Sequence, residues 1–252
     1  MILRAGDRGE GVATVQRLLG VASDGVFGPA TDEAVRAFQR GAGLAPDGVV
    51  GPATMRALLN GTKRITEQDM QQAATALGVD LASIKAVTTV ESLASGFLSD
   101  GRPVILFERH VMRRRLAELG RDVDLLQRYL PEIINGVPGG YKGGSAEHDR
   151  LYLAQQIDFD SAVESASWGL FQIMGFHWQV LGYESAKAFA RAMNQSEGQQ
   201  LDAFVRFIKA DAGLHRALRS KNWADFAARY NGPAYSKNQY DVKLAEAYKE
   251  FA

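Results

Sequence analysis

The chain has 252 residues, 46% of them apolar and 23% charged, and its 29 basic and 29 acidic side chains give a formal net charge of zero. This balance argues against a protein that finds nucleic acid or an anionic membrane by bulk charge. The absence of cysteine excludes disulfide scaffolds, thiolate nucleophiles and zinc sites built on Cys ligands.

The N-terminus carries no apolar stretch of the kind that a secretory signal needs. No run approaches the roughly 18 uninterrupted apolar residues of a transmembrane helix. We therefore expect a protein that is made in the cytoplasm without a signal peptide and does not insert stably into a membrane. If it acts outside the cytoplasm, another component must release it.

An internal repeat occupies the N-terminal region. Residues 24–31 (DGVFGPAT) recur 23 positions later as residues 47–54 (DGVVGPAT), with seven of the eight positions identical. In each copy Asp-Gly is typical of a turn, and the proline suits the first position of a helix. An apolar stripe follows each copy, and residues 12–19 carry a third. The pattern predicts three short helices within about 60 residues.

The composition changes after a short linker, residues 60–64 (NGTKR). We therefore expect a first domain at residues 1–61 and a second domain at residues 66–252. Thr66 and Asp69 have the spacing of a capping box, which would open the first helix of the second domain.

The second domain is predicted to be mainly helical with one short β element. Residues 104–107 (VILF) are β-prone, and residues 135–147 form a long glycine-rich loop of a kind that is usually functional or disordered. The clearest helix is predicted from Leu201, with apolar positions on one face as far as Leu218. Ser236 is predicted to cap the last helix.

Glu91 is the first candidate for chemistry. Asp80 is predicted to cap the preceding helix, and Glu91 continues the apolar stripe of Ile84 and Val87. A carboxyl group on a buried stripe loses hydration, which raises its pKa and suits it to donate a proton near neutrality. The alternative is a Glu at a frayed helix end that reaches water or pairs with an Arg.

Two more carboxylates are candidates for a second acidic group. Glu108 follows the β-prone run, and its alternative role is a salt bridge with Arg109 or Arg102. Asp100 lies in the sequence Asp-Gly-Arg-Pro, a turn signature that favours a structural role.

Two later motifs could contact a ligand. Residues 167–175 (SWGLFQIMG) place Gln172 among apolar residues, where its amide must be satisfied internally or by a ligand. Tyr230 and Asn231 lie in a sharp turn, where they could bind a sugar or only shape the chain. The four histidines show no HExxH or HxH spacing, so a zinc hydrolase is disfavoured and no metal or cofactor is expected.

The repeat, with the GxG and VQxxL patterns before it, resembles the peptidoglycan-binding module of cell-wall hydrolases. The resemblance implies wall binding in a shallow groove beside the repeated loops. The residues to which it points are Asp24, Phe27, Asp47 and Val50. Six basic and six acidic side chains in residues 1–60 favour polar, shape-based binding over charge attraction.

Five ordered motifs from residue 66 onward resemble the N-acetylmuramidase domain of modular phage endolysins. They are residues 90–97, 101–110, 139–141, 165–175 and 229–233. Ala94 stands where the resemblance leads us to expect glycine. The expected fold is mainly α: a small three-helix peptidoglycan-binding domain, then a larger helical lysozyme-like domain with a short β element.

The resemblance implies an endolysin that cleaves the β-1,4 bond between N-acetylmuramic acid and N-acetylglucosamine and so lyses the host cell. Glu91 would be the general acid, and Glu108, or else Asp100, the base or charge stabiliser. The sugar contacts would be Gln172, Tyr230 and Asn231.

The implied partner is peptidoglycan, reached by a monomer in the periplasm after a holin-type partner has permeabilised the membrane. One alternative is a lytic transglycosylase, which cuts the same bond without water. The other is a non-catalytic wall-binding virion protein, which would leave residues 66–252 unexplained.

Overall fold

The computed structural model describes residues 2–61, 63–92, 95–233 and 235–252, and for Asn60 the backbone alone. The chain divides into two compact units, Met1–Arg64 with Ser99–Arg102 and Ile65–Leu98 with Pro103–Ala252. Thr62 of the predicted linker and Ala94 lie outside the described residues.

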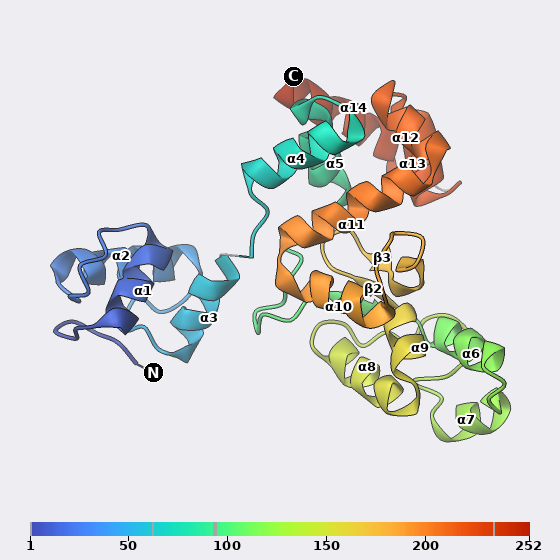
Figure 1. Cartoon of the computed structure of the whole chain (residues 1–252), viewed down its shortest axis with the longest axis horizontal. Helices are drawn as coiled ribbons and strands as arrows, with labels where there is room; N and C mark the ends of the chain where they lie inside the picture. The colour runs from blue at the N-terminus through green and yellow to red at the C-terminus, as the bar shows by residue number, and fades with distance from the viewer. Residues whose placement is uncertain (1, 62, 93–94, 234) are drawn as a thin grey trace. The chain divides into compact units, whose positions relative to one another are not determined.

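The first unit contains the three predicted helices, α1 Glu10–Leu19, α2 Pro29–Gly41 and α3 Pro52–Gly61 (Figure 1). Both later helices begin at the repeated proline, as the motif predicts. Gly25 and Gly48 have φ angles of 72° and 73°, the left-handed conformation that the Asp-Gly turn requires.

A buried glutamine holds the first copy of the repeat together. Gln16 is 1% exposed, and its Nε2 lies 2.8 Å from Asp24 Oδ1, 3.0 Å from the Val26 carbonyl and 2.9 Å from Thr31 Oγ1. Its Oε1 accepts the backbone N–H of Gly25 at 2.9 Å. One amide therefore fixes both the turn and the first turn of α2.

The second copy repeats this arrangement around Gln39. The Nε2 of Gln39 lies 2.7 Å from Asp47 Oδ1, 3.0 Å from the Val49 carbonyl and 3.1 Å from Thr54 Oγ1. Its Oε1 accepts the N–H of Gly48 at 3.0 Å. The aspartate and threonine of the repeated motif are therefore explained by the architecture of the unit.

Phe27 and Val50 lie in the core of the first unit rather than on its surface. Each is 1% exposed, and they pack with Val12, Val15 and Val35. Neither side chain is thus placed to touch a glycan, although the resemblance pointed to both. Apolar burial of this kind is what stabilises so small a unit.

Gln39→Leu is expected to lower the unfolding free energy of the first unit by about 2 kcal/mol or more, because it leaves the buried N–H of Gly48 unpaired and removes the hydrogen bonds to Asp47, Val49 and Thr54. Chemical denaturation of the full chain, followed by circular dichroism, measures this. Arg40→Leu, on the exposed face of α2, is the matched control and should change stability by less than about 0.5 kcal/mol. Equal stability of the two variants would contradict the role given to Gln39.

The second unit is mainly helical with a small sheet, which confirms the predicted fold class. Its first helices are α4 Glu67–Leu77, α5 Leu81–Glu91, α6 Arg109–Glu118 and α7 Val123–Tyr129. After the glycine loop follow α8 Ala146–Ile157, α9 Phe159–Glu164, α10 Ala186–Gln195, α11 Glu197–Ala210, α12 Ala212–Arg219, α13 Trp223–Asn231 and α14 Tyr240–Phe251. Two short 3₁₀ helices are η1 Gly175–His177 and η2 Tyr235–Asn238.

The sheet is antiparallel, in the order β1-β2-β3. Its strands are β1 Ile105–Phe107, β2 Ala166–Trp168 and β3 Ile173–Met174. Leu106 pairs with Ser167, which pairs in turn with Met174. The β-prone run is confirmed as β1, and the 167–175 motif contributes the two other strands.

The predicted helix starts at α4 and α5 are confirmed. Thr66 and Asp69 form a capping box, and the Asp80 side chain accepts the N–H of Ser83 at 2.8 Å. In both cases a side-chain oxygen pairs a backbone N–H that the helix itself leaves free.

Two other helix predictions are wrong. The helix expected from Leu201 to Leu218 is two helices, because the Asp211 side chain accepts backbone N–H groups of the next turn and starts α12. Ser236 lies in η2 and does not cap α14, which is preceded by Gln239 with a φ of 53°.

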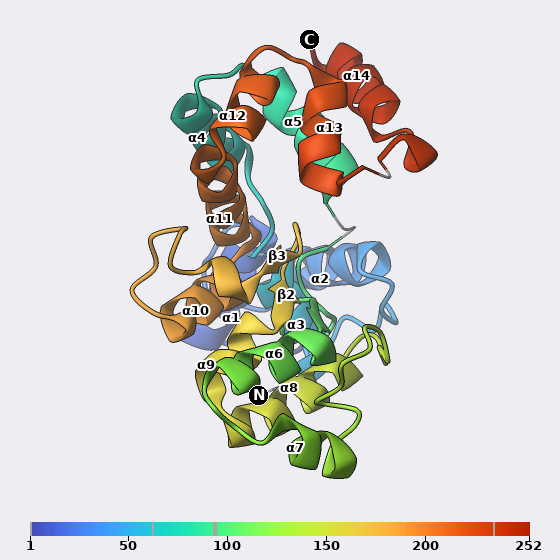
Figure 2. The same cartoon turned by 90° about the vertical axis from the view of Figure 1, so that its right-hand side faces the viewer.

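Within the second unit, α11 runs between two groups of elements (Figures 1 and 2). Helices α4, α5, α12, α13 and α14 lie at one end of it, and the sheet with α6–α10 lies at the other. Side chains of both groups join one hydrophobic core. Among the described helices none is by itself long and apolar enough to cross a membrane, and α4 with α5 qualifies only as a pair bent by 111°.

Candidate active site

Glu91, the last residue of α5, lines a cavity of about 390 Å³ in the second unit. The cavity is formed by the end of α5, the β2–β3 hairpin with η1, and helices α11, α13 and α14. Its lining includes Glu91, Phe171, Gln172, His177, Tyr230 and Asn231. Four predicted site residues thus meet in one place, although Glu91 and Asn231 are 140 positions apart.

The environment of Glu91 favours its protonated form. Burial raises the pKa of Glu91 to about 7, and the hydrogen bond from Asn231 opposes this rise. Asn231 Nδ2 donates to Glu91 Oε1 at 2.9 Å, so α13 fixes the direction of the carboxyl group. A carboxyl that keeps its proton near neutrality is suited to general acid catalysis.

Two buried side chains of α11 bind the backbone at Gly96, which follows α5, and at Leu170 in the β2–β3 turn. Glu197 Oε1 accepts the N–H of Gly96 at 2.8 Å, and Gln200 Oε1 accepts the N–H of Leu170 at 2.7 Å. A Cβ on Gly96 would lie 2.1 Å from Gln200 Oε1. Gly96 and the β2–β3 turn are therefore fixed against the same helix. Sequence reasoning missed these two residues.

Tyr230 ties α13 to the β2–β3 hairpin. Its hydroxyl donates to the carbonyl of Phe171 at 3.1 Å, and its ring stacks on Phe226. Burial raises the pKa of Tyr230. The phenol therefore stays protonated and shapes one wall of the cavity.

Gln172 satisfies its amide internally while lining the cavity. Its Oε1 accepts the hydroxyl of Ser167 at 2.7 Å, and its Nε2 donates to the Gly169 carbonyl at 2.8 Å. Its φ of 51° is unusual for a residue other than glycine. Such conformations persist where the surrounding contacts hold them, as the two hydrogen bonds do here.

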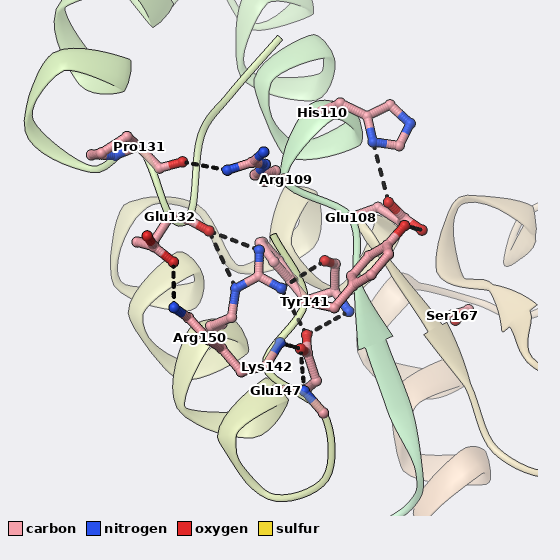
Figure 3. A network of polar contacts seen from close by, with 12 residues as sticks. Glu108, Arg109, His110, Pro131, Glu132, Tyr141, Lys142, Glu147, Arg150 and Ser167 are labelled. Atoms are coloured by element: carbon pink, nitrogen blue, oxygen red, sulfur yellow. Dashed lines mark hydrogen bonds and ion pairs between the residues drawn. The ribbon is translucent and has the colours of Figure 1, made fainter. Parts of the chain in front are cut away.

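Glu108 lies at the end of β1 and is not among the residues that line the Glu91 cavity. Its Oε1 accepts the hydroxyl of Tyr141 at 2.8 Å, and its Oε2 lies 3.2 Å from His110 Nδ1 (Figure 3). The alternative salt bridge with an arginine is not formed: Arg109 donates to backbone carbonyls such as that of Val137.

Strand alternation relates Glu108 to the cavity. Side chains two positions apart along a strand point to one face of a sheet, so Glu108 extends the face of Leu106. Leu106 pairs with Ser167, and Ser167 with Met174, which lines the cavity. Glu108 therefore follows β1 on the face of the sheet that carries Met174, one of the residues that line the cavity.

A buried ion pair between Glu147 and Arg150 lies next to β1 and Glu108 (Figure 3). Glu147 is fully buried and Arg150 is 5% exposed, and their charged groups lie 2.8 Å apart. Arg150 also donates to the carbonyls of Phe107 and Glu132. β1, the glycine loop and α8 are thereby joined around one pair of charges.

Backbone groups complete the surroundings of Glu147. It accepts the N–H of Phe107 at 3.0 Å, of Lys142 at 2.5 Å and of Gly143 at 2.9 Å. Burial by itself would raise the pKa of Glu147, but these donors together with Arg150 lower it. Phe107 precedes Glu108 and Lys142 follows Tyr141, so this pair positions both members of the Glu108–Tyr141 hydrogen bond.

Asp100 has the turn geometry that its sequence indicates. Its carboxylate accepts the backbone N–H of Arg102 at 3.0 Å and pairs with the guanidinium at 2.6 Å. These contacts are local. Among the described residues no group of three or more His, Asp or Glu side chains is placed to hold a metal ion.

Comparisons with known proteins agree with this architecture. Residues 80–252 match the family model for N-acetylmuramidase, and residues 8–58 match that for a peptidoglycan binding domain. The crystal structure of Burkholderia AP3 phage endolysin is similar over 100% of this chain and 99% of that chain, with 49% sequence identity and a TM-score of 0.73. A comparison with curated proteins gave no match. The chain therefore belongs to the N-acetylmuramidase family, as a two-domain peptidoglycan hydrolase that carries a peptidoglycan binding domain at its N-terminus.

Proposed function

We propose that Glu91 is the general acid with which this muramidase cleaves the β-1,4 bond between N-acetylmuramic acid and N-acetylglucosamine. The observation that carries this proposal is a carboxyl with a pKa of about 7 in a polar cavity. Its proton passes to the glycosidic oxygen while positive charge develops on the sugar ring, as in an oxocarbenium-like transition state.

The other predicted residues of the cavity are given supporting roles. Asn231 orients the Glu91 carboxyl and, after proton transfer, donates a hydrogen bond to the carboxylate that remains. Gln172 and Tyr230 line the cavity, and we assign them contacts with the sugar next to the scissile bond.

Glu108 is proposed as a charge stabiliser on the face of the sheet that carries Met174, in preference to Asp100. Glu108→Gln is expected to lower the rate on purified sacculi by about 10²-fold, because a negative charge near the developing cation is lost. Asp100→Asn is the comparison and should stay within about threefold. An unchanged rate in Glu108→Gln would leave this residue as a structural partner of Tyr141 and His110.

The N-terminal unit is proposed to hold the enzyme on the wall through the exposed surface of its repeated loops, which carries Asp24 and Asp47. The likeness to a phage endolysin supports action on the wall of a host cell. We further propose that the protein acts as a monomer and that it reaches the periplasm after a holin-type partner has opened the membrane.

Mass spectrometry of the muropeptides released from purified sacculi tests the proposed reaction. Hydrolysis gives products with a reducing N-acetylmuramic acid end. A transglycosylase would give 1,6-anhydro ends, lighter by one water, and a non-catalytic wall-binding protein would release nothing. Either of these last two results contradicts the proposal.

A further inference from the structure

His177 lines the same cavity as Glu91, but none of the catalytic or sugar-binding roles proposed above involves it. It ends η1, directly after β3. Its ring centroid lies 4.4 Å from that of Phe176 and 5.1 Å from that of Phe207. These two aromatic rings hold the imidazole in place along the cavity wall.

The ring nitrogens of His177 have no hydrogen bond or ion pair within the described ranges of the chain. The other three histidines differ in this respect. The Nε2 of His148 and of His215 each lies 2.8 Å from a backbone carbonyl, and Nδ1 of His110 lies 3.2 Å from the carboxylate of Glu108. His177 is therefore the histidine whose polar atoms stay available to a molecule in the cavity.

The charges around His177 favour a neutral ring. Burial lowers the pKa of His177 below 6.5, and the positive charge of Arg115 on α6 lowers it further. The titratable groups that share its cavity are Glu91 on α5, Tyr230 on α13 and Tyr240 on α14. A neutral imidazole keeps an electron pair with which it can accept a proton.

We propose that His177 is a second catalytic residue, which accepts a proton from the water that attacks the anomeric carbon. This inference rests on the assignment of Glu91 as the general acid. It supplies the proton acceptor that Glu108, lying outside the cavity lining, does not provide.

In the hydrolytic step Glu91 gives up one proton and His177 accepts one. Glu91 gives its proton to the glycosidic oxygen as the bond between that oxygen and the anomeric carbon breaks. The oxygen of water bonds to the same carbon, and a proton of that water passes to His177. The imidazolium then releases a proton and Glu91 regains one, so the net change is the addition of one water to the glycosidic bond.

The test is His177→Phe and His177→Gln, assayed on purified sacculi between pH 4 and 9. Both variants are expected to lose at least about 100-fold in kcat with little change in KM, since neither side chain accepts a proton. Wild type should show an acid limb of kcat/KM with an apparent pKa below 6.5, and both variants should lack it. Two substitutions of different polarity guard against a folding defect in one of them, which circular dichroism detects.

His148→Gln is the control and should keep both the rate and the acid limb within about threefold. Rates of the His177 variants within threefold of wild type, an unchanged acid limb, or a rise in KM with kcat unchanged would each overturn the inference. Glu91→Gln, measured beside them, separates the two proposals. If Glu91→Gln is inactive while the His177 variants stay active, the inference about His177 is wrong and the assignment of Glu91 stands. If Glu91→Gln is active, the assignment of Glu91 is wrong.

Discussion

Glu91→Gln is expected to lower the rate of sacculus hydrolysis by about 10³-fold or more while leaving sacculus binding unchanged. The amide keeps the shape of the side chain and an oxygen for the Asn231 hydrogen bond, but it has no acidic proton to give. Positioned proton donors contribute about 10²–10⁴-fold to such reactions. Release of dye-labelled fragments measures the rate, and co-sedimentation with sacculi measures binding.

The control for this variant is Glu67→Gln, at an exposed carboxylate of α4, which should leave the rate within about twofold. Turnover of Glu91→Gln within a few-fold of wild type would contradict the catalytic assignment. Loss of both turnover and binding would indicate misfolding. The pH dependence of the stability of the variant distinguishes misfolding from a catalytic defect.

The pKa of Glu91 predicts how the activity and the stability of the wild type each depend on pH. Above about pH 7 the acid is ionised, so kcat/KM should fall about tenfold per pH unit. The folded-state pKa is raised above the usual value of 4.5, so the folded state binds the extra proton between these pH values. Stability is therefore fully present below pH 4.5 and is lost as the pH rises toward 7.

The same linkage predicts that Glu91→Gln is more stable than wild type at pH 8. The shift from 4.5 to about 7 corresponds to a gain of up to about 3 kcal/mol, because each pKa unit is worth about 1.4 kcal/mol. Near pH 4 the difference should vanish. Denaturant unfolding at the two pH values measures it, and a variant that is less active but more stable cannot owe its loss to misfolding.

The features that could be predicted from the sequence are those set by neighbouring residues. The repeat reveals its turns because each copy contains its own Asp, Gly and Pro, and the caps at Thr66 and Asp80 lie within one turn of the groups they bind. The position of Glu91 on the buried stripe of α5 could be predicted for the same reason, because helical spacing relates it to Ile84 and Val87. The purpose of the repeat was harder to infer, because the contacts of Gln16 and Gln39 show that much of its identity is structural.

The features that could not be predicted depend on residues far apart in the chain. Glu197 binds Gly96 from 101 positions away, and Asn231 binds Glu91 from 140. No periodicity marks such pairs. Burial of a carboxylate in an amphipathic helix, as at Glu197 in α11, becomes informative only when its partner is known. The same holds for β2 and β3, which are too short to show alternation and are defined by the pairing of β1 with β2 and of β2 with β3.

Glu147→Ala is expected to destabilise the second unit by about 3–5 kcal/mol, because it leaves Arg150 as an uncompensated buried charge. It also removes the acceptor of three backbone N–H groups, at Phe107, Lys142 and Gly143. Asp149→Ala in the same turn of α8 is the matched control, since that side chain is exposed. Denaturant unfolding of the full chain measures both.

The double variant Glu147→Leu/Arg150→Leu separates charge from hydrogen bonding in the same network. Removing both charges ends the cost of an unpaired ion, so the double variant should be more stable than Glu147→Ala. It should stay less stable than wild type, because the backbone groups of the glycine loop and β1 still lack their partners. A double variant less stable than Glu147→Ala would show that the charge of Arg150 is not what makes the single substitution costly. Because the pair positions Phe107 and Lys142, the residues next to Glu108 and Tyr141, a folded double variant should also lose activity if Glu108 contributes to catalysis.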